Sequence, residues 1–261
     1  MRSLSIAATG MLAQQTNVDV ISNNIANMNT TAFKRQRAEF QDLLYQQVSR
    51  PGASTSLDGT RVPSGIQLGA GVKTAGIYRI AEQGALTNTG NRYDMAINGE
   101  GYFQITLPNG DTAYTRAGSF QLSDQGELVT NDGYLVQPNI TIPQGAVDVI
   151  VSKTGQVQVK MADQTDLQDV GQIELATFVN EAGLEAIGSN LLMETPASGT
   201  PTVAAPGQPG FGSLNQNFLE ASNVNPVSEI TSLISAQRAY EMNSRVVKAS
   251  DEMLATSTQL K

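Results

Sequence analysis

The sequence predicts an α+β fold in which long helices at the two ends of the chain enclose an inserted all-β domain. Two patterns lead to this fold class. Apolar residues recur with heptad spacing over residues 4–28 and again over residues 233–260, which is typical of helices that pack along a seam. Residues 72–193 instead show short alternating runs between frequent turn sequences, which indicate a β-sandwich or β-barrel. We therefore expect the ends to form one discontinuous coiled-coil domain, from which the β domain projects.

The first predicted element is an amphipathic helix of about 25 residues that ends near residues 27–29. Only Gln14 interrupts its heptad pattern, and its outer face is neutral, so neighbouring chains could pack around it. A core helix of a globular domain shows a similar pattern, but a long seam near the start of the sequence favours a partner helix. The a and d positions hold Leu4, Ala7, Met11, Val18, Ile21, Ile25 and Met28.

A second helix is predicted over residues 33–48, because Phe33, Phe40, Leu43 and Val48 belong to an apolar stripe. The following segment, from about residue 46 to residue 72, is rich in Gly, Pro, Ser and Thr. This composition predicts an extended loop or an irregular hairpin, although a flexible linker has the same composition. Apolar residues spaced along the segment favour ordering against a neighbour.

Turn sequences divide the β-rich region into short strands, and a loop rich in Pro, Gly, Ser and Ala follows at residues 194–212. The predicted strands cover residues 102–107, 112–116, 120–122, 128–130, 134–137, 148–152, 156–160 and 172–178.

The last predicted element is a helix over residues 227–259. Asn225 is its expected N-cap, and Pro226 suits the first helical position, where the missing N–H does no harm. Its heptad residues are Leu233, Tyr240, Val247 and Leu254. The predicted domains are the terminal-helix domain (1–32 with 225–261), a linker region (33–75 with 205–224) and the β-rich domain (76–204).

The composition excludes most catalytic and metal sites. The chain has 261 residues, of which 40% are hydrophobic and 15% are charged, so a real core can form under a weakly charged surface. Histidine and cysteine are absent, which excludes the serine-histidine-aspartate triad, cysteine nucleophiles, common zinc sites and disulfides. The net charge of −8 argues against a nucleic-acid partner. We predict no enzyme, no cofactor and no metal.

Several features leave other classes open. Carboxylates such as Asp94, Glu100 and Asp111 could form a glycosidase pair, as in a secreted carbohydrate-active enzyme, but most adjoin Gly or Asn and suit turns. A plain coiled-coil adaptor is a further alternative. The basic cluster of Lys34, Arg35 and Arg37 is interpreted as a local ion pair or a subunit contact. The N-terminus lacks the apolar region of a cleaved signal peptide, and no apolar run suits membrane insertion.

Motifs along nearly the whole chain resemble bacterial flagellar rod and hook proteins. They read SNNIANMNTTAFK at residues 22–34, DMAINGEGYF at 94–103, YTRAGSF at 114–120, SNVN at 222–225 and QRAYEMN at 237–243. Residues 50–53 and 63–72 resemble the insertion of the distal rod member, which hook protein lacks. Ala32 stands where glycine is common in the family, which leaves open whether this turn needs a positive φ. The residues of the rod-type loop are Pro51, Gly52, Pro63, Ser64 and Gly65.

The resemblance implies a structural subunit of the flagellar distal rod, which polymerises helically into a rigid drive shaft that carries torque from motor to hook. The implied partners are other copies of the chain, proximal rod subunits, hook protein, the P and L ring proteins and the flagellar type III export apparatus. The implied location is the basal body, from the periplasm to the outer membrane, after export without a cleaved signal peptide. A proximal rod or hook subunit of the same family is the alternative. We expect the heptad residues of both helices to form the polymerisation interface.

Overall fold

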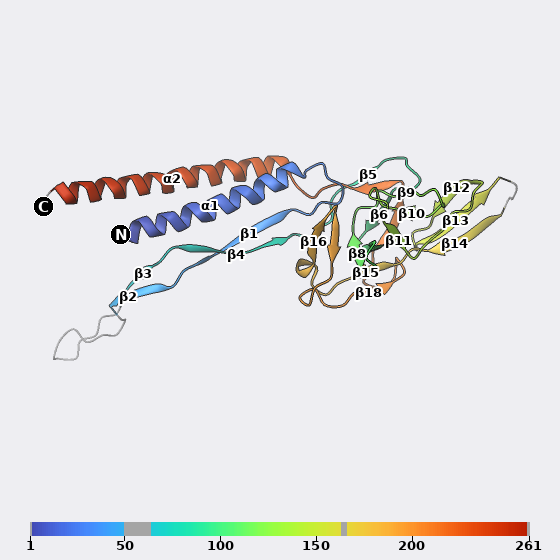
Figure 1. Ribbon diagram of the computed structural model, residues 1–261, viewed down its shortest axis with the longest axis horizontal. Helices are drawn as coiled ribbons and strands as arrows, with labels where there is room; N and C mark the ends of the chain where they lie inside the picture. Colours follow the sequence, from blue (N-terminus) through green and yellow to red (C-terminus); the bar gives the residue numbers. More distant parts are fainter. Residues whose placement is uncertain (1, 50–63, 163–165, 260–261) are drawn as a thin grey trace. The chain divides into compact units, whose positions relative to one another are not determined.

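The computed structural model describes residues 2–49, 64–162 and 166–259. A helix stands at each end of the chain, α1 (Arg2–Ala26) and α2 (Pro226–Gln259), and the strands lie between them in sequence, which confirms the α+β class (Figure 1). The chain divides into two compact units. The helical unit comprises Met1–Ala26, Gln36–Tyr78 and Asn225–Lys261, and the β unit comprises Asn27–Arg35 and Arg79–Val224.

Both terminal helices form where the sequence predicts them. Helix α1 is 25 residues long and stops just before the asparagine-rich residues 27–29. At the start of α2, Oδ1 of Asn225 accepts hydrogen bonds from the backbone N–H groups of Val227 (3.1 Å) and Ser228 (3.3 Å). These bonds satisfy donors that the first helical turn leaves without a partner, so the predicted N-cap is confirmed.

The predicted helix over residues 33–48 is wrong. This segment forms strands β1 (Gln36–Asp42) and β2 (Tyr45–Ser49), which pair with β4 (Val72–Arg79) and β3 (Ile66–Gly69). Burial alternates along β1, since Gln36, Ala38 and Phe40 are half-buried and the residues between them are exposed. A period of two is the pattern of a strand with one covered face, and it outweighs the loose apolar stripe that suggested a helix.

The flanks of the rod-type loop form the irregular hairpin that the sequence predicts. Strands β2 and β3 are antiparallel, from Tyr45 opposite Gly69 to Ser49 opposite Ile66, with a shift in register near Ser49. Pro51, Gly52 and Pro63 lie outside the described residues. Ser64 is an exposed bend and Gly65 is half-buried, directly before β3.

The β unit is built on a sheet that branches at strand β7. One edge of β7 pairs with β8, while its other edge is shared by β15, which pairs with Tyr102 and Phe103, and by β11, which pairs with residues 104–106. Beyond these neighbours the order continues through β17 to β16, through β10 to β9, and from β15 to β18. The strands are β7 (Tyr102–Thr106), β8 (Thr112–Thr115), β9 (Gln121–Leu122), β10 (Leu128–Val129), β11 (Leu135–Gln137), β15 (Leu175–Thr177), β16 (Glu185–Gly188), β17 (Leu191–Met193) and β18 (Thr202–Ala204).

Smaller sheets complete the β unit. Strands β12 (Ala146–Val151), β13 (Gln156–Met161) and β14 (Leu167–Gln172) form an antiparallel meander. The chain then returns before α2, and β19 (Ser213–Gln216) pairs with β6 (Met95–Asn98) while β20 (Phe218–Glu220) pairs with β5 (Leu86–Asn88). A short 3-10 helix, η1, covers Glu181–Gly183. Strands β19 and β20 therefore place the C-terminal end of the β unit beside strands from its N-terminal part.

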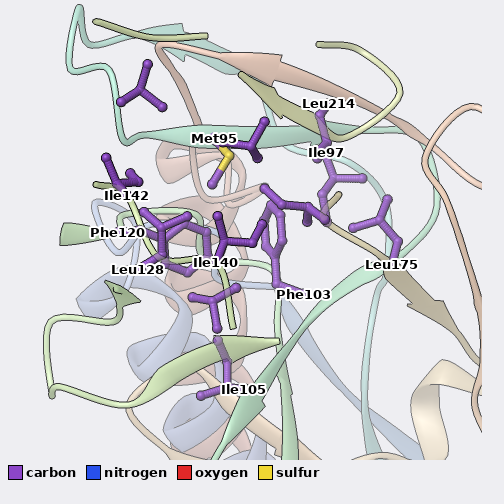
Figure 2. Close-up of a cluster of buried hydrophobic side chains, with 14 of the residues drawn as sticks. Met95, Ile97, Phe103, Ile105, Phe120, Leu128, Ile140, Ile142, Leu175 and Leu214 are labelled. Atoms are coloured by element: carbon purple, nitrogen blue, oxygen red, sulfur yellow. The ribbon is translucent and has the colours of Figure 1, made fainter. Parts of the chain in front are cut away.

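The core of the β unit is made by apolar side chains from strands far apart in sequence. Figure 2 shows Phe103 and Phe120 among them, and their rings meet edge to face with centroids 5.1 Å apart. A second cluster surrounds Phe178, whose ring contacts those of Tyr102 and Tyr114. Aromatic pairs in this geometry stabilise a core beyond the area they bury. The predicted strand at 102–107 supplies residues to both clusters, because successive side chains of β7 point to opposite faces.

Candidate assembly interface

The heptad residues of α1 are only partly covered within one chain. Ala7 and Ile21 are buried, whereas Leu4, Met11, Val18 and Ile25 are half-buried. Met28 lies beyond the end of α1 and is 39% exposed. The fully buried positions of the helix are Ala7, Ala13, Val20, Ile21 and Asn24, so the buried face is turned slightly from the predicted one.

The predicted heptad residues of α2 are also incompletely covered. Leu233, Val247 and Leu254 are half-buried, and Tyr240 is 44% exposed. The positions buried most deeply along this helix are Glu229, Ala236 and Ser250, which are polar or small. The apolar residues that sequence reasoning placed in the seam therefore retain surface that another molecule can cover.

Both helices carry large apolar side chains that are exposed. Leu12 of α1 is 65% exposed, and Met242 of α2 is 61% exposed. An apolar surface of this extent on a helix is typical of a protein–protein interface. The heptad analysis missed most of these residues, although their spacing of three, four, seven or eight along α2 is a signal for one face. Besides Tyr240, the exposed apolar residues are Ile6 and Leu12 on α1, and Val227, Ile230, Ile234, Met242, Val246 and Met253 on α2.

Asn24, from the first family-like motif, joins three elements of the helical unit. Its Nδ2 donates to the backbone oxygen of Gln36 (2.8 Å) and to Oε2 of Glu229 (3.1 Å), and its Oδ1 accepts from the backbone N–H of Gln36 (2.8 Å). The side chain is buried, and these bonds reach β1 and the first turn of α2. The asparagine therefore fixes where α1, β1 and α2 meet.

In the β unit, Glu220 is the centre of a buried ion cluster. Its Oε1 accepts hydrogen bonds from Nζ of Lys34 (2.6 Å) and from the backbone N–H of Gly84 (2.8 Å), while its Oε2 accepts from Nε of Arg116 (2.6 Å). Nζ of Lys34 also donates to the backbone oxygen of Glu82 (2.8 Å). Of the basic cluster, Lys34 does form an ion pair within the chain, but the pair is not local, because its partner lies 186 residues away in the sequence.

The charges in this cluster change one another's proton affinity. Burial alone raises the pKa of Glu220, but Arg116 and Lys34 outweigh it and hold the pKa below the usual value for a carboxyl. Burial lowers the pKa of Lys34, and the nearby Arg116 lowers it further, against the hydrogen bond to Glu220. The carboxylate is therefore ionised at neutral pH and compensates two buried cations, which would otherwise be very costly.

Asn223 links the segments around this ion cluster through hydrogen bonds to their backbone groups. Its Nδ2 donates to the backbone oxygens of Ile80 and Glu82 (both 3.0 Å), and its Oδ1 accepts from the backbone N–H of Arg35 (2.7 Å). The motifs at residues 22–34, 114–120 and 222–225 therefore supply Lys34, Arg116 and Asn223 to one place. Sequence reasoning identified the motifs but could not bring them together.

Two features of the motif residues are explained by close backbone contacts. A Cβ atom on Gly118 would lie 1.6 Å from the backbone oxygen of Met95, so only glycine fits. Ala32 has φ 56°, and its N–H donates to the backbone oxygen of Glu220 (2.8 Å). The turn at Ala32 does take the left-handed conformation, although the residue is not glycine.

Within residues 2–49, 64–162 and 166–259, no group of three or more Asp, Glu, His or Cys side chains is placed to hold a metal ion. Neither α1 nor α2 is long and apolar enough to cross a membrane over the residues described.

Three family models match separate parts of the chain. A flagella basal body rod protein model matches residues 4–34, a flagellar hook protein FlgE/F/G D1 domain model matches residues 96–159, and a flagellar basal body rod FlgEFG protein C-terminal model matches residues 215–260. The first and last of these segments contain most of α1 and α2.

Curated relatives distinguish between members of this group. The chain is 62% identical to the flagellar basal-body rod protein FlgG of Caulobacter vibrioides over 261 residues, which is 100% of both chains. It is 52% identical to FlgG of Agrobacterium fabrum over 97% of both chains. Against the rod protein FlgF of Caulobacter vibrioides the identity is 34%, over 98% of this chain and 96% of the relative. These are structural proteins rather than enzymes, and the chain therefore belongs to the FlgG family of flagellar basal-body rod proteins, as a structural subunit of the flagellar distal rod.

Proposed function

We propose that the chain builds the distal rod as a helical polymer whose subunits associate through α1 and α2, with the two helices of each chain paired as a coiled coil. The observation that carries this proposal is the large apolar surface left exposed on both helices. An open helical polymer needs interfaces in which one patch meets a different patch on the next subunit. Two helices with separate exposed faces supply such patches.

The interface proposed here combines two groups of residues. The first is the predicted heptad set on α1 and α2, which is only partly covered within a chain. The second is the exposed apolar set, from Ile6 and Leu12 on α1 to Met253 on α2. Burial of this surface between subunits provides the driving force for assembly, because apolar area removed from water stabilises association.

The proposed surroundings follow from the family. The rod would begin on proximal rod subunits, pass through the P and L rings from the periplasm to the outer membrane, and carry the hook protein at its far end. Subunits would reach this site through the flagellar type III export apparatus, without a cleaved signal peptide. The polymer would transmit torque from the motor to the hook.

We propose that the rod-type loop, from about residue 46 to residue 72, stiffens the polymer by bridging neighbouring subunits. The hairpin of β2 and β3 supports this role, because Tyr45, Val48, Ile66 and Leu68 are apolar residues that it exposes. A chain without residues 50–63 is expected to give a bendable filament or a failed rod. Unchanged rigidity in electron micrographs would contradict this role.

The assembly proposal is tested by adding charge to the neutral face of α1. Gln15 and Ser22 are exposed and seven residues apart, so Gln15→Glu and Ser22→Glu place carboxylates on one face of the helix. We expect both variants to lose helical polymers in electron micrographs of concentrated protein while the β unit keeps its unfolding midpoint. Gln125→Glu, at an exposed position of the β unit, is the matched control and should polymerise normally. Normal assembly of the α1 variants would make this face an ordinary solvent-exposed surface.

A further inference from the structure

The contacts between α1 and α2 follow a regular polar pattern. Oγ of Ser250 lies 3.2 Å from Oγ of Ser3, and Nδ2 of Asn24 donates to Oε2 of Glu229 at 3.1 Å. Between these two contacts, Asn243 packs on Gly10 so closely that a Cβ atom on the glycine would lie 2.9 Å from Nδ2 of the asparagine. Each step of seven residues forward along α1 is met by a step of seven residues backward along α2.

The step between Gly10 and Asn24 fits the same pattern. The heptad that contains Ser3, Gly10 and Asn24 also contains Asn17, and the matching series on α2 contains Ala236, which is buried. We name these eight positions the polar ladder; they are Ser3, Gly10, Asn17 and Asn24 on α1, and Ser250, Asn243, Ala236 and Glu229 on α2. An antiparallel pair with a strict heptad series on each helix has one register in which all the steps coincide.

We propose that the polar ladder is a register key that pairs α1 with α2 of the same chain and excludes other alignments of the two helices. Apolar contacts alone permit several alignments, because a seam of Leu, Ile, Val and Met can slide by a heptad at little cost. Polar groups in a helix seam instead specify one register, since a misaligned group is buried without its partner.

The side chains at the steps of the ladder show why other registers are disfavoured. Asn243 faces Gly10, the residue without a side chain. A shift of one heptad would place Asn243 against Asn17 or Ser3, whose side chains occupy that space. It would also take Glu229 away from Asn24, which is fixed by its two hydrogen bonds to Gln36. Glu229 is 5% exposed, so its carboxylate depends on a partner in this position.

This inference rests on the proposed polymer in one respect. In the proposed polymer, each α2 would have the α1 helices of neighbouring chains within reach as well as its own. The ladder would distinguish the helix of the same chain from those of neighbours, and the exposed apolar residues would remain for contacts between chains. Specificity of this kind requires a contact that is lost in the wrong pairing.

The test uses cysteine pairs, since the natural chain has no cysteine. Ser3→Cys with Ser250→Cys places two thiols at the first step of the ladder. Ser3→Cys with Asn243→Cys is the control, because its second cysteine lies one heptad away, about 10 Å along the helix. After oxidation of the full-length protein, in solution and after assembly, we expect a disulfide within one chain for the first pair and none for the control. Disulfides between chains for the first pair would overturn the proposal.

A second measurement separates the ladder from helix packing in general. The first cysteine pair is placed in a chain that also carries Glu229→Leu and Asn243→Leu, which keep an apolar seam but remove the polar groups. We expect the yield of the disulfide within one chain to fall about tenfold, with products between chains appearing, while circular dichroism shows that the helices persist. Gln237→Leu with Glu241→Leu, polar residues at exposed positions of the same helix, is the matched control and should leave the yield unchanged.

The outcomes also separate this inference from the proposed polymer. An unchanged yield in the Glu229→Leu and Asn243→Leu chain would show that the ladder does not set the register. A disulfide within one chain in a protein that forms no polymers in electron micrographs would keep the register key and refute the proposed assembly.

Discussion

Nε of Arg116 donates a 2.6 Å hydrogen bond to Oε2 of Glu220, and both side chains are almost completely buried. The two residues are 104 positions apart in the sequence. Because Lys34 binds the other oxygen of the same carboxylate, Glu220 holds together three segments that enter the β unit separately. The buried cluster of Lys34, Arg116 and Glu220 can therefore form only when the first segment of the β unit and its last strand, β20, are both in place.

Glu220→Gln is expected to destabilise the β unit by about 3–5 kcal/mol, because it leaves Lys34 and Arg116 buried without their anion. The free energy of unfolding is measured by urea denaturation of the full chain. Glu185→Gln, at an exposed position on β16, removes the same charge and is expected to change stability by less than about 0.5 kcal/mol. Equal midpoints for the two variants would show that Lys34 and Arg116 do not need the charge of Glu220.

The contribution of Glu220 should depend on pH in one direction. Its pKa in the folded chain lies below the unfolded value of 4.5, so the folded state holds the proton less tightly than the unfolded chain. The stability that ionised Glu220 provides is therefore complete above pH 4.5 and is lost as the pH falls through the lower, folded pKa.

This pH dependence is measured as the difference in unfolding free energy between the natural chain and Glu220→Gln. We expect a constant difference from pH 7 down to about pH 5, and a shrinking one at more acidic pH. A difference that grows on acidification would contradict the assigned direction. The comparison removes the contribution of Glu181, whose pKa burial raises and whose effect on stability has the opposite sign.

Gly118→Ala is expected to destabilise the β unit by about 3 kcal/mol or more, because the new methyl group would overlap the backbone oxygen of Met95. The same two residues also share a backbone hydrogen bond, from the N–H of Met95 to the oxygen of Gly118 (3.0 Å), so a shift of the backbone would break it. Gly76→Ala, on β4, is the control, since a Cβ there has no heavy atom within 4 Å. Thermal unfolding of both variants measures the difference; similar melting temperatures would refute the steric explanation.

Local signals in the sequence account for the elements that were predicted correctly. Asn225 and Pro226 mark the start of α2 because a cap acts on the next few residues alone. The turns between β7 and β13 are also local, and the strands they separate follow within a few residues. The helix prediction for residues 36–49 failed because the partner strands, β3 and β4, follow only at residues 66–79, and an unpaired stretch gives no sign of the strand it will meet.

The candidate site was predictable only in part for the same reason. Heptad spacing identified both terminal helices, but the deeply buried positions include Asn24, Glu229 and Ser250, which are polar. Their partners depend on the register between helices more than 200 residues apart. Likewise, Lys34 was interpreted as a member of an ion pair, while Glu220 carried no local signal that distinguished it from other carboxylates.

Ala32→Gly is expected to stabilise the β unit slightly, by up to about 1 kcal/mol. At φ 56° the alanine methyl is in steric conflict with its own backbone, and removing this conflict gains roughly 1–2 kcal/mol, less about 0.4–1 kcal/mol for the greater freedom of glycine in the unfolded chain. Ala32 is buried, so the loss of its methyl contacts offsets a further part of the gain.

The matched variant at this position is Ala32→Val, whose branched side chain fits the left-handed conformation poorly. It should lower the urea midpoint, whereas Ala32→Gly should raise it. The hydrogen bond from residue 32 to the backbone oxygen of Glu220 fixes the turn in both variants. A urea midpoint that rises from valine through alanine to glycine therefore reports the strain of the left-handed backbone conformation. If glycine proved less stable than alanine, methyl packing would outweigh backbone strain, and the alanine would be the better residue at this turn.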